Sequence, residues 1–261
     1  VFNSATAIYN KREFSMIENI DVDGIDIPFD SEWKKLSIAL SGGADSAMLA
    51  YLLCEIITEK DLDCEVHVIS HTRCWKTKPW QRINAIDVLN NLLKTFPNVT
   101  FQRHLNFIPP EFEYANTGPN LTDEYGKQVS GDNIELRSYA EYVCHTYSIP
   151  VYFNAVTRNP RLENFNGMAE RDIEPTEDNK HLTIMEHMGG LACHPFRFVE
   201  KNWVMKQYKD RGLDEFLNLT RSCEGTFADL DYTNYKPGQE VPVCEECFWC
   251  KEREWAIEQN K

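Results

Sequence analysis

Short apolar runs and longer amphipathic segments alternate through the chain. Four runs have the length of buried strands and lie at 36–40, 65–70, 99–105 and 150–156. Segments with apolar residues three and four positions apart predict helices at 47–60, 80–96, 133–147, 201–209, 213–219 and 251–259. Alternating strands and helices favour a parallel sheet with right-handed crossovers. We therefore expect an α/β fold with a doubly wound, mostly parallel sheet.

The same pattern also predicts the buried face of one helix, an N-terminal hairpin and two loops. The inward face of the helix at 80–96 should comprise Ile83, Ile86, Val88, Leu89, Leu92 and Leu93. Between residues 20 and 28, apolar residues alternate with Asp around Gly24, which predicts a small hairpin at a sheet edge. The polar stretches 106–132 and 158–182 are predicted loops, and the first is long enough to cover a substrate.

One turn between a predicted strand and a predicted helix carries chemistry. Its sequence is Ser41-Gly42-Gly43-Ala44-Asp45-Ser46. Adjacent glycines let the backbone approach a ligand, and a helix N-terminus adds free N–H groups and partial positive charge. Together they form an anion site, most often for phosphate. Ser41 and Ser46 add hydroxyl donors, and Asp45 can hold a metal ion or orient a water. An ordinary glycine turn capped by serines is the alternative.

The turn contains no Lys, so it differs from the loop type that grips β- and γ-phosphates with a lysine. Ser-Gly-Gly-x-Asp-Ser instead resembles the PP-loop of the ATP pyrophosphatase enzymes. This resemblance implies that ATP is split between its α- and β-phosphates, with adenylation of a substrate and release of pyrophosphate. It also implies that Ser41, Gly42, Gly43, Asp45 and Ser46 bind ATP with Mg²⁺.

Two further residues follow from strand position. Ser70 and His71 lie where the predicted strand at 65–70 ends. In open parallel sheets, ligands bind at the carboxyl ends of the strands, so these residues are placed to border a nucleotide. A histidine in an ordinary surface loop is the alternative for His71.

The nine cysteines fall into two groups. Cys54, Cys64, Cys74, Cys144 and Cys193 are scattered in apolar contexts, so each is expected to be a buried free thiol. The others form a Cys-x2-Cys-x2-Cys run with one remote partner, and they comprise Cys223, Cys244, Cys247 and Cys250. Four thiolates suit tetrahedral Zn²⁺ that anchors the last helix, and we expect Glu245 and Glu246 to be solvated. An iron–sulfur cluster or reactive thiols are the alternatives.

The composition of the chain limits the kinds of partner that the protein can bind. The net charge of −14 argues against a broad nucleic-acid-binding face. No run approaches the ~20 apolar residues of a membrane span, and the first residues lack the apolar core of a signal peptide. We therefore expect a cytoplasmic protein with no membrane partner, in a compartment that keeps thiols reduced.

The C-terminal quarter resembles one family more narrowly. Its pattern runs Pro195-x5-Lys201-x2-Val204, then Gly212-Leu213, then Thr220-x-Ser222-Cys223, then the three-cysteine run. This is similar to 7-cyano-7-deazaguanine synthases, over most of residues 36–255. Two departures from that family are Asn154-Ala155-Val156-Thr157-Arg158-Asn159 after the fourth strand and a long spacer before Cys244.

The resemblance implies a function and a domain plan. It implies ATP-dependent conversion of 7-carboxy-7-deazaguanine and ammonia into the nitrile, often in homodimers. Asp45, Ser46 and Lys201 would be catalytic, and the four cysteines would bind zinc. We expect an N-terminal extension or edge hairpin at 1–35, an ATP-binding α/β domain at 36–195 and a zinc-binding helical segment at 196–261.

Two other functions stay open at this stage. The loop could adenylate a different acceptor, as in related enzymes that modify tRNA bases or transfer sulfur. The chain could also be a non-catalytic nucleotide-binding module held together by zinc. The acidic charge disfavours the first, and the intact Asp45 and Ser46 disfavour the second.

Overall fold

The computed structural model describes residues 17–73, 81–108, 131–160, 182–185, 190–223 and 242–261. Its strands are β1 (Glu18–Val22), β2 (Ile25–Phe29), β3 (Lys35–Ala39), β4 (Glu65–Arg73), β5 (Thr100–Ile108), β6 (Val151–Phe153), β7 (Leu182–Met185) and β8 (Gly190–Cys193). Its helices are α1 (Ala44–Glu59), α2 (Gln81–Thr95), α4 (Gly131–Tyr147), α5 (Lys201–Asp210), α6 (Asp214–Asn218) and α7 (Phe248–Glu258).

Six strands form one twisted sheet in the order β5-β4-β3-β6-β8-β7. The first five are parallel to one another, and β7 pairs antiparallel with β8 at one edge. The chain builds outward from β3 through β4 to β5, then returns to the other side of β3 with β6. The predicted doubly wound, mostly parallel α/β sheet is confirmed, and the order of its strands reverses between β3 and β6.

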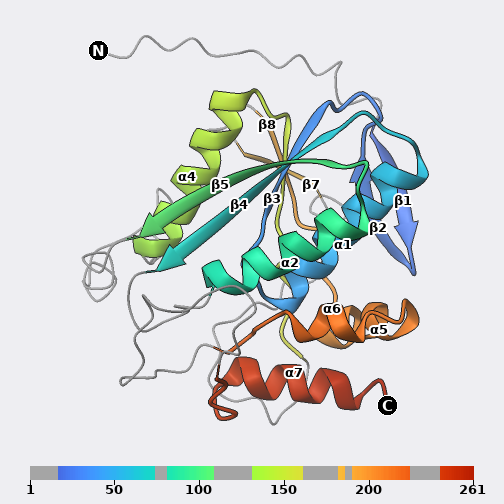
Figure 1. Cartoon of the computed structure of the whole chain (residues 1–261), viewed down its shortest axis with the longest axis vertical. Coiled ribbons are helices and arrows are strands. Elements are labelled where there is room, and N and C mark those ends of the chain that lie inside the picture. The colour runs from blue at the N-terminus through green and yellow to red at the C-terminus, as the bar shows by residue number, and fades with distance from the viewer. Residues whose placement is uncertain (1–16, 74–80, 109–130, 161–181, 186–189, 224–241) are drawn as a thin grey trace.

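Successive residues of the strands serve two separate cores. Ile38 and Val68 belong to the larger apolar cluster, which α1, α2 and α5 cover. Ile69 and Tyr152 belong to a smaller cluster beneath α4. Successive side chains of a strand point to opposite faces, so one short strand can supply both cores. Helices therefore cover both faces of the sheet (Figure 1).

The N-terminal hairpin forms as predicted, but its placement at an edge of the main sheet is wrong. Strands β1 and β2 make a two-stranded sheet of their own. Ile27 and Phe29 are buried in the larger core, and the turn residue Asp23 accepts hydrogen bonds from Trp203 and Gln207 of α5. Burial of one apolar face against helices thus replaces pairing with a sheet edge.

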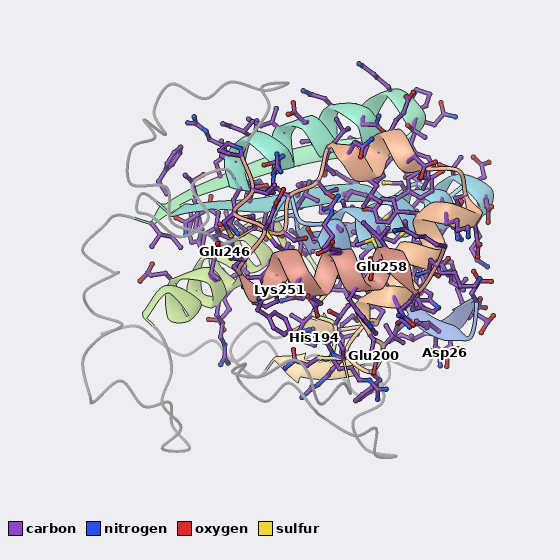
Figure 2. The ribbon with its side chains drawn as sticks, turned by 90° about the horizontal axis from the view of Figure 1, so that it is seen from below. Asp26, His194, Glu200, Glu246, Lys251 and Glu258 are labelled. Carbon is purple, nitrogen blue, oxygen red and sulfur yellow. The ribbon has the colours of Figure 1, made fainter. Side chains whose placement is uncertain are left out.

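The three C-terminal helices lie together at the end of the molecule that faces α1 (Figure 1). Helix α5 packs against both α1 and α7. The buried Tyr208 hydroxyl of α5 donates a hydrogen bond to the Ala44 carbonyl at 2.9 Å. Figure 2 shows α7 crossing this face, with Lys251 and Glu258 on the helix and Glu246 before its start. Helices α5, α6 and α7 therefore contribute side chains to the same apolar core as α1.

Most predicted elements appear within a few residues of their expected bounds. The exceptions are β7 and β8, which lie in and after the stretch that we predicted to be a loop. In α2 the inward face is largely as expected, except that Leu93 is 45% exposed and Asn84 is buried instead. The remaining parts of the two predicted loops, 109–130 and 161–181, lie outside the described residues, as does Cys74.

Four of the scattered cysteines are buried free thiols, as predicted: Cys54, Cys64, Cys144 and Cys193. Burial raises the pKa of Cys64 to about 12 and that of Cys144 to about 11. These thiols are therefore protonated near neutrality and behave as small apolar side chains. Within the described part of the chain, we find no helix with the length and apolarity needed to cross a membrane.

His194, which directly follows β8 (Figure 2), should make the fold sensitive to acid. Burial, with help from Arg197, lowers its pKa from 6.5 to about 4. Above pH 6.5 the folded and unfolded states are both neutral at this side chain. As the pH falls from 6.5 to 4, the unfolded state gains a proton that the folded state does not bind, so stability falls.

We predict that His194→Gln removes this loss. Between pH 6.5 and 4, the parent should lose up to about 3 kcal/mol more unfolding free energy than the variant. Urea denaturation across this pH range measures the difference. His145→Gln is the matched control, because His145 lies exposed in the last turn of α4. Equal pH dependence in the parent and His194→Gln would contradict the prediction.

Candidate functional site

A cavity of about 330 Å³ opens where the strand order reverses, at the carboxyl ends of β3 and β6. This is the point of an open α/β sheet at which ligands bind. The loop after β3 forms one wall through Ser41, Gly43, Asp45 and Ser46. Residues 154–156, which follow β6, form another wall. The cavity therefore joins the predicted phosphate loop to the segment that departs from the family pattern.

The two glycines of the loop have different tasks. Gly42 adopts φ +76°, and a Cβ there would lie 2.7 Å from both the Ala85 nitrogen and the Asn84 Cβ of α2. This position thus excludes side chains through both its backbone conformation and its close packing. Gly43 has φ −83° and is the N-cap of α1. Its Cβ would meet the Ser41 hydroxyl at 3.3 Å, which is tight but not prohibitive.

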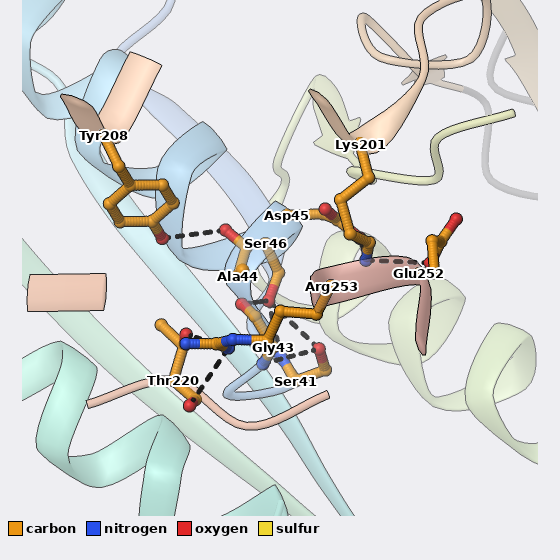
Figure 3. A network of polar contacts seen from close by, with 10 residues as sticks. All are labelled: Ser41, Gly43, Ala44, Asp45, Ser46, Lys201, Tyr208, Thr220, Glu252 and Arg253. Atoms are coloured by element: carbon orange, nitrogen blue, oxygen red, sulfur yellow. Dashed lines mark hydrogen bonds and ion pairs between the residues drawn. The ribbon is translucent and has the colours of Figure 1, made fainter. Parts of the chain in front are cut away.

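The serines brace the loop from within. The hydroxyls of Ser41 and Ser46 lie 3.0 Å apart, and that of Ser46 also accepts the Ser41 N–H and donates to the Gly43 carbonyl. The Gly43 N–H donates to the Ser41 hydroxyl at 3.3 Å (Figure 3). These contacts preform the turn and hold the N-terminus of α1 toward the cavity. The first N–H groups of a helix have no partner within that helix.

A buried charge cluster stands beside the loop. Lys201, the first residue of α5, is 2% exposed and donates to Asp45 Oδ2 at 2.7 Å. The same ammonium lies 3.2 Å from Oε2 of Glu252 in α7, which is fully buried (Figure 3). Burial alone would lower the pKa of Lys201, but Asp45 and Glu252 raise it above its ordinary value. Lys201 is therefore a fixed cation in the wall of the cavity.

The other oxygen of Asp45 fits a metal ion. Asp45 Oδ1 is buried and has no hydrogen-bond partner among the described residues. Carboxylate oxygens are preferred ligands of Mg²⁺, which commonly uses one or two carboxylates together with substrate phosphates. Asp45 lines the same cavity as the N-terminus of α1. The donor set thus suits Mg²⁺ that arrives with a phosphorylated substrate.

The segment before Cys223 is tied to the loop and to α7. The Arg221 N–H donates to the Gly42 carbonyl at 2.8 Å. From α7, the Arg253 guanidinium donates to the carbonyls of Thr220 and Leu217 and to the Thr220 hydroxyl. This segment therefore connects the C-terminal helix to the turn that bounds the cavity.

The four predicted cysteine ligands converge on one point. The sulfurs of Cys223, Cys244, Cys247 and Cys250 all lie within 4.8 Å of one another. The Cys223–Cys244 and Cys247–Cys250 separations are 3.5 Å, and Cys244–Cys250 is 4.0 Å. A tetrahedral ion with bonds of about 2.3 Å to sulfur places its ligands about 3.8 Å apart. The cluster therefore fits a single metal ion.

The surroundings of the cluster agree with metal binding. Burial tends to raise the pKa of Cys244, but backbone N–H groups of Cys247 and Glu246 and the neighbouring thiols lower it to about 7. Cys244 can therefore supply a thiolate near neutral pH, whereas burial and hydrogen bonds with Cys247 and Cys223 raise the pKa of Cys250. Glu245 and Glu246 are exposed, as predicted. Cys223 and Trp249 also line the cavity, so the cysteine cluster borders it directly.

The remaining predicted residues take different positions. His71 lines the cavity, with its ring 3.3 Å from the Asn106 amide nitrogen. Ser70 is buried and is not among the cavity-lining residues. Both lie inside β4, because this strand continues to Arg73.

Sequence reasoning missed Glu252, Arg253 and Asn84. The first two lie in a helix of mixed polarity, and Asn84 occupies a face that looked apolar.

Comparison with known proteins adds little to this description. No family model matches the chain, and no curated protein matches it.

Solved structures that are similar to it include three enzymes. The U34-tRNA thiolase NcsA from Methanococcus maripaludis, solved with its 4Fe–4S cluster, is 16% identical, with a TM-score of 0.41; the match covers 87% of this chain and 66% of the thiolase. The NH3-dependent NAD synthetase from Campylobacter jejuni is 16% identical, with a TM-score of 0.40 and coverage of 71% and 67%. Phosphoadenylyl-sulfate reductase from Candida auris is 11% identical, with a TM-score of 0.37 and coverage of 74% and 81%. Because these identities and TM-scores are low, the function is inferred from the residues of the site.

Gly42→Ala tests the tight packing of the loop. A side chain at φ +76° should destabilise the fold by roughly 1–2 kcal/mol. The overlap with Ala85 and Asn84 should add about 1–3 kcal/mol. Gly24→Ala is the matched control, since Gly24 has φ +82° and a Cβ added there would meet nothing within 4 Å. Denaturant titration should show a larger loss for Gly42→Ala, and equal losses would contradict the close contact.

Proposed function

We propose that this protein is an ATP-dependent enzyme of the PP-loop type, which cleaves ATP between its α- and β-phosphates and adenylates a carboxylate. The observation that carries the proposal is the lysine-free Ser41–Ser46 turn. It leads into the N-terminus of α1 at the reversal point of the sheet, and Lys201 lines the same cavity.

The geometry suits pyrophosphate as a leaving group. The N-terminus of α1 and the backbone of the loop offer N–H donors and partial positive charge to an anion. The reacting carboxylate oxygen attacks the α-phosphorus, and the bond from that phosphorus to the bridging oxygen breaks. Pyrophosphate departs with the electron pair. Fixed donors near these oxygens stabilise the charge that develops on them.

Charged side chains complete the site. Asp45 would hold Mg²⁺ through Oδ1, and Mg²⁺ would neutralise phosphate charge when bound. Asp45 Oδ2 and Glu252 hold the Lys201 ammonium in the cavity wall. From there Lys201 can bind a phosphate oxygen or the adenylated intermediate. Its burial keeps the charge close to the reaction and away from solvent screening.

For the acceptor we infer a 7-deazapurine carboxylate, with ammonia as the second substrate. The similarity of the C-terminal motifs to 7-cyano-7-deazaguanine synthases supports this choice. Tyr152 and Trp249 give the cavity aromatic side chains, and Asn154 adds an amide, which together suit a planar heterocycle. Ammonia attacks the acyl carbon of the adenylate, AMP leaves, and an amide forms. In the second round the amide oxygen attacks the α-phosphorus of another ATP and pyrophosphate leaves. AMP then departs with that oxygen, and loss of two protons from the amide nitrogen gives the nitrile.

For the cysteine site we infer Zn²⁺ in a structural role. In a 4Fe–4S cluster each thiolate binds a different iron, whereas these sulfurs lie close enough to share one ion. Four thiolates form a closed site of the structural type, with no open position for a substrate. Cys247 is the N-cap of α7 and Cys250 lies in its first turn, so the ion would fix the start of that helix.

The reaction products test the proposed chemistry. Incubation with ATP, Mg²⁺, ammonium and a panel of 7-deazapurine acids should yield AMP and pyrophosphate, detected by mass spectrometry with the amide or nitrile. Asp45→Asn should lower turnover by at least ~100-fold, the scale for losing one electrostatic element. Asp61→Asn, in an exposed turn after α1, is the control and should match the parent. ADP and orthophosphate as products of the parent would refute the assignment.

Metal analysis tests the cysteine site. Freshly purified protein should contain about one zinc ion per chain, as expected for a single four-cysteine site. Cys247→Ser should lose most of this zinc and destabilise residues 201–261 more than the sheet, as measured by hydrogen exchange. Cys54→Ala removes a buried thiol within α1 and should keep its zinc. Iron with visible absorbance, or no metal in the parent, would contradict the inference.

A further inference from the structure

Helix α7 carries a predicted metal ligand and a buried acid that are close in sequence. Cys250 lies in the first turn of α7, and Glu252 follows two residues later. Glu252 is fully buried, although carboxylates are rarely buried without a partner. Its Oε2 lies 3.2 Å from the Lys201 ammonium. The proposed chemistry uses Lys201 and Asp45 at the reacting phosphates, and Glu252 enters it only as the second carboxylate beside Lys201.

The cluster joins three elements that are far apart in sequence. Asp45 comes from α1, Lys201 from α5 and Glu252 from α7. A lysine ammonium has three donors, so it can serve both carboxylates at once. Because Lys201 is nearly fully buried, its long side chain has little freedom to reach other partners. Asp45 and Glu252 together therefore limit where the ammonium can lie.

A second connection runs from α7 to the same loop. Arg253, the next residue, holds the Thr220 carbonyl at 3.2 Å and its hydroxyl at 2.8 Å. The adjacent Arg221 N–H holds the Gly42 carbonyl at 2.8 Å. Figure 3 shows Arg253 and Glu252 extending from α7 to the two sides of this site. One turn of α7 thus contacts both the lysine and the segment that supports the phosphate loop.

A merely stabilising role explains this arrangement poorly. Burial of an ion pair often contributes no more stability than apolar residues of the same size. An acid at this position does, however, give direction to a lysine that must point at Asp45. The orientation of the acid depends on how the first turn of α7 is anchored. Cys247 and Cys250 lie at that turn and belong to the four-cysteine cluster, so a metal ion bound there would help to anchor it.

We propose that Glu252 is a positioning residue that holds Lys201 against Asp45, and that the metal bound by the cysteines fixes α7 so that Glu252 reaches Lys201. The metal site would thereby control the geometry of the ATP cavity as well as the stability of the C-terminal helix. The proposal rests on the proposed ATP chemistry for its effect on turnover only. The placement of Lys201 can be tested without any reaction.

Chemical labelling of Lys201 in the full chain measures this placement. Acetic anhydride would be applied to the metal-loaded protein, and peptide mass spectrometry would give the labelling rate of Lys201 relative to exposed Lys60. Glu252→Gln should raise this ratio roughly tenfold, the scale for weakening one charge-assisted hydrogen bond. Glu254→Gln changes an exposed acid on the same helix and should leave the ratio unchanged. Glu252→Asp keeps the charge one methylene farther away and should give an intermediate ratio.

Metal removal tests the second half of the proposal. Stripping the parent with a chelator should raise Lys201 labelling by a similar factor, while the ratio for Lys34, at the opposite end of β3 from the cavity, stays constant. Glu252→Gln should retain its zinc. In turnover, Glu252→Gln should lower kcat about tenfold and change KM for ATP by less than about twofold, because positioning of Lys201 affects the transition state more than binding.

The outcomes separate this proposal from the proposed function. Parent-like labelling of Lys201 in Glu252→Gln, or in Glu252→Asp should the first variant fail to fold, would overturn the positioning role. Unchanged labelling after metal removal would overturn the link to the cysteine site. Labelling that changes as expected in a protein that makes no AMP would support the positioning of Lys201 and reject the ATP chemistry.

Discussion

The buried ammonium of Lys201 is the interaction on which the site depends. It brings together the start of α1, the start of α5 and the middle of α7, since its partners Asp45 and Glu252 lie on the first and the last of these helices. Burial of three charges is unfavourable unless they satisfy one another. The packing of α5 and α7 against α1 is therefore coupled to the electrostatics of the cavity, and neither can change without the other.

This coupling marks the limit of prediction from sequence. The period of apolar residues predicted most helices and the central strands, because a buried face leaves a direct record in the chain. The short β7 and β8 left little periodic signal. The contact between Lys201 and Asp45 spans 156 residues and leaves no local signal at all. A lysine is unfavourable at a helix N-terminus, which carries partial positive charge, and the structure explains the position of Lys201 by two acids from other helices.

The candidate site was predictable to different degrees for similar reasons. The phosphate loop is a contiguous motif whose residues are neighbours in the chain, so its place between β3 and α1 could be predicted. The cysteines were recognisable because thiolate spacing is nearly independent of the rest of the fold. Glu252 and Asn84 gain their roles only from what packs against them. In the sequence they are an ordinary helical acid and an interruption of an apolar face.

The contact between the Gly42 loop and α2 has a mechanical consequence. Because no side chain fits between Gly42 and Asn84, the loop rests directly on the helix backbone, and the amide of Asn84 also holds the Leu219 carbonyl. No layer of side chains that could rearrange lies between this loop and the helix. When an anion binds in the cavity, the loop can move towards α2 only if that helix and the segment before Cys223 move with it. The turn is therefore rigid, and we expect the cavity to adapt to a ligand through its other wall, residues 154–156.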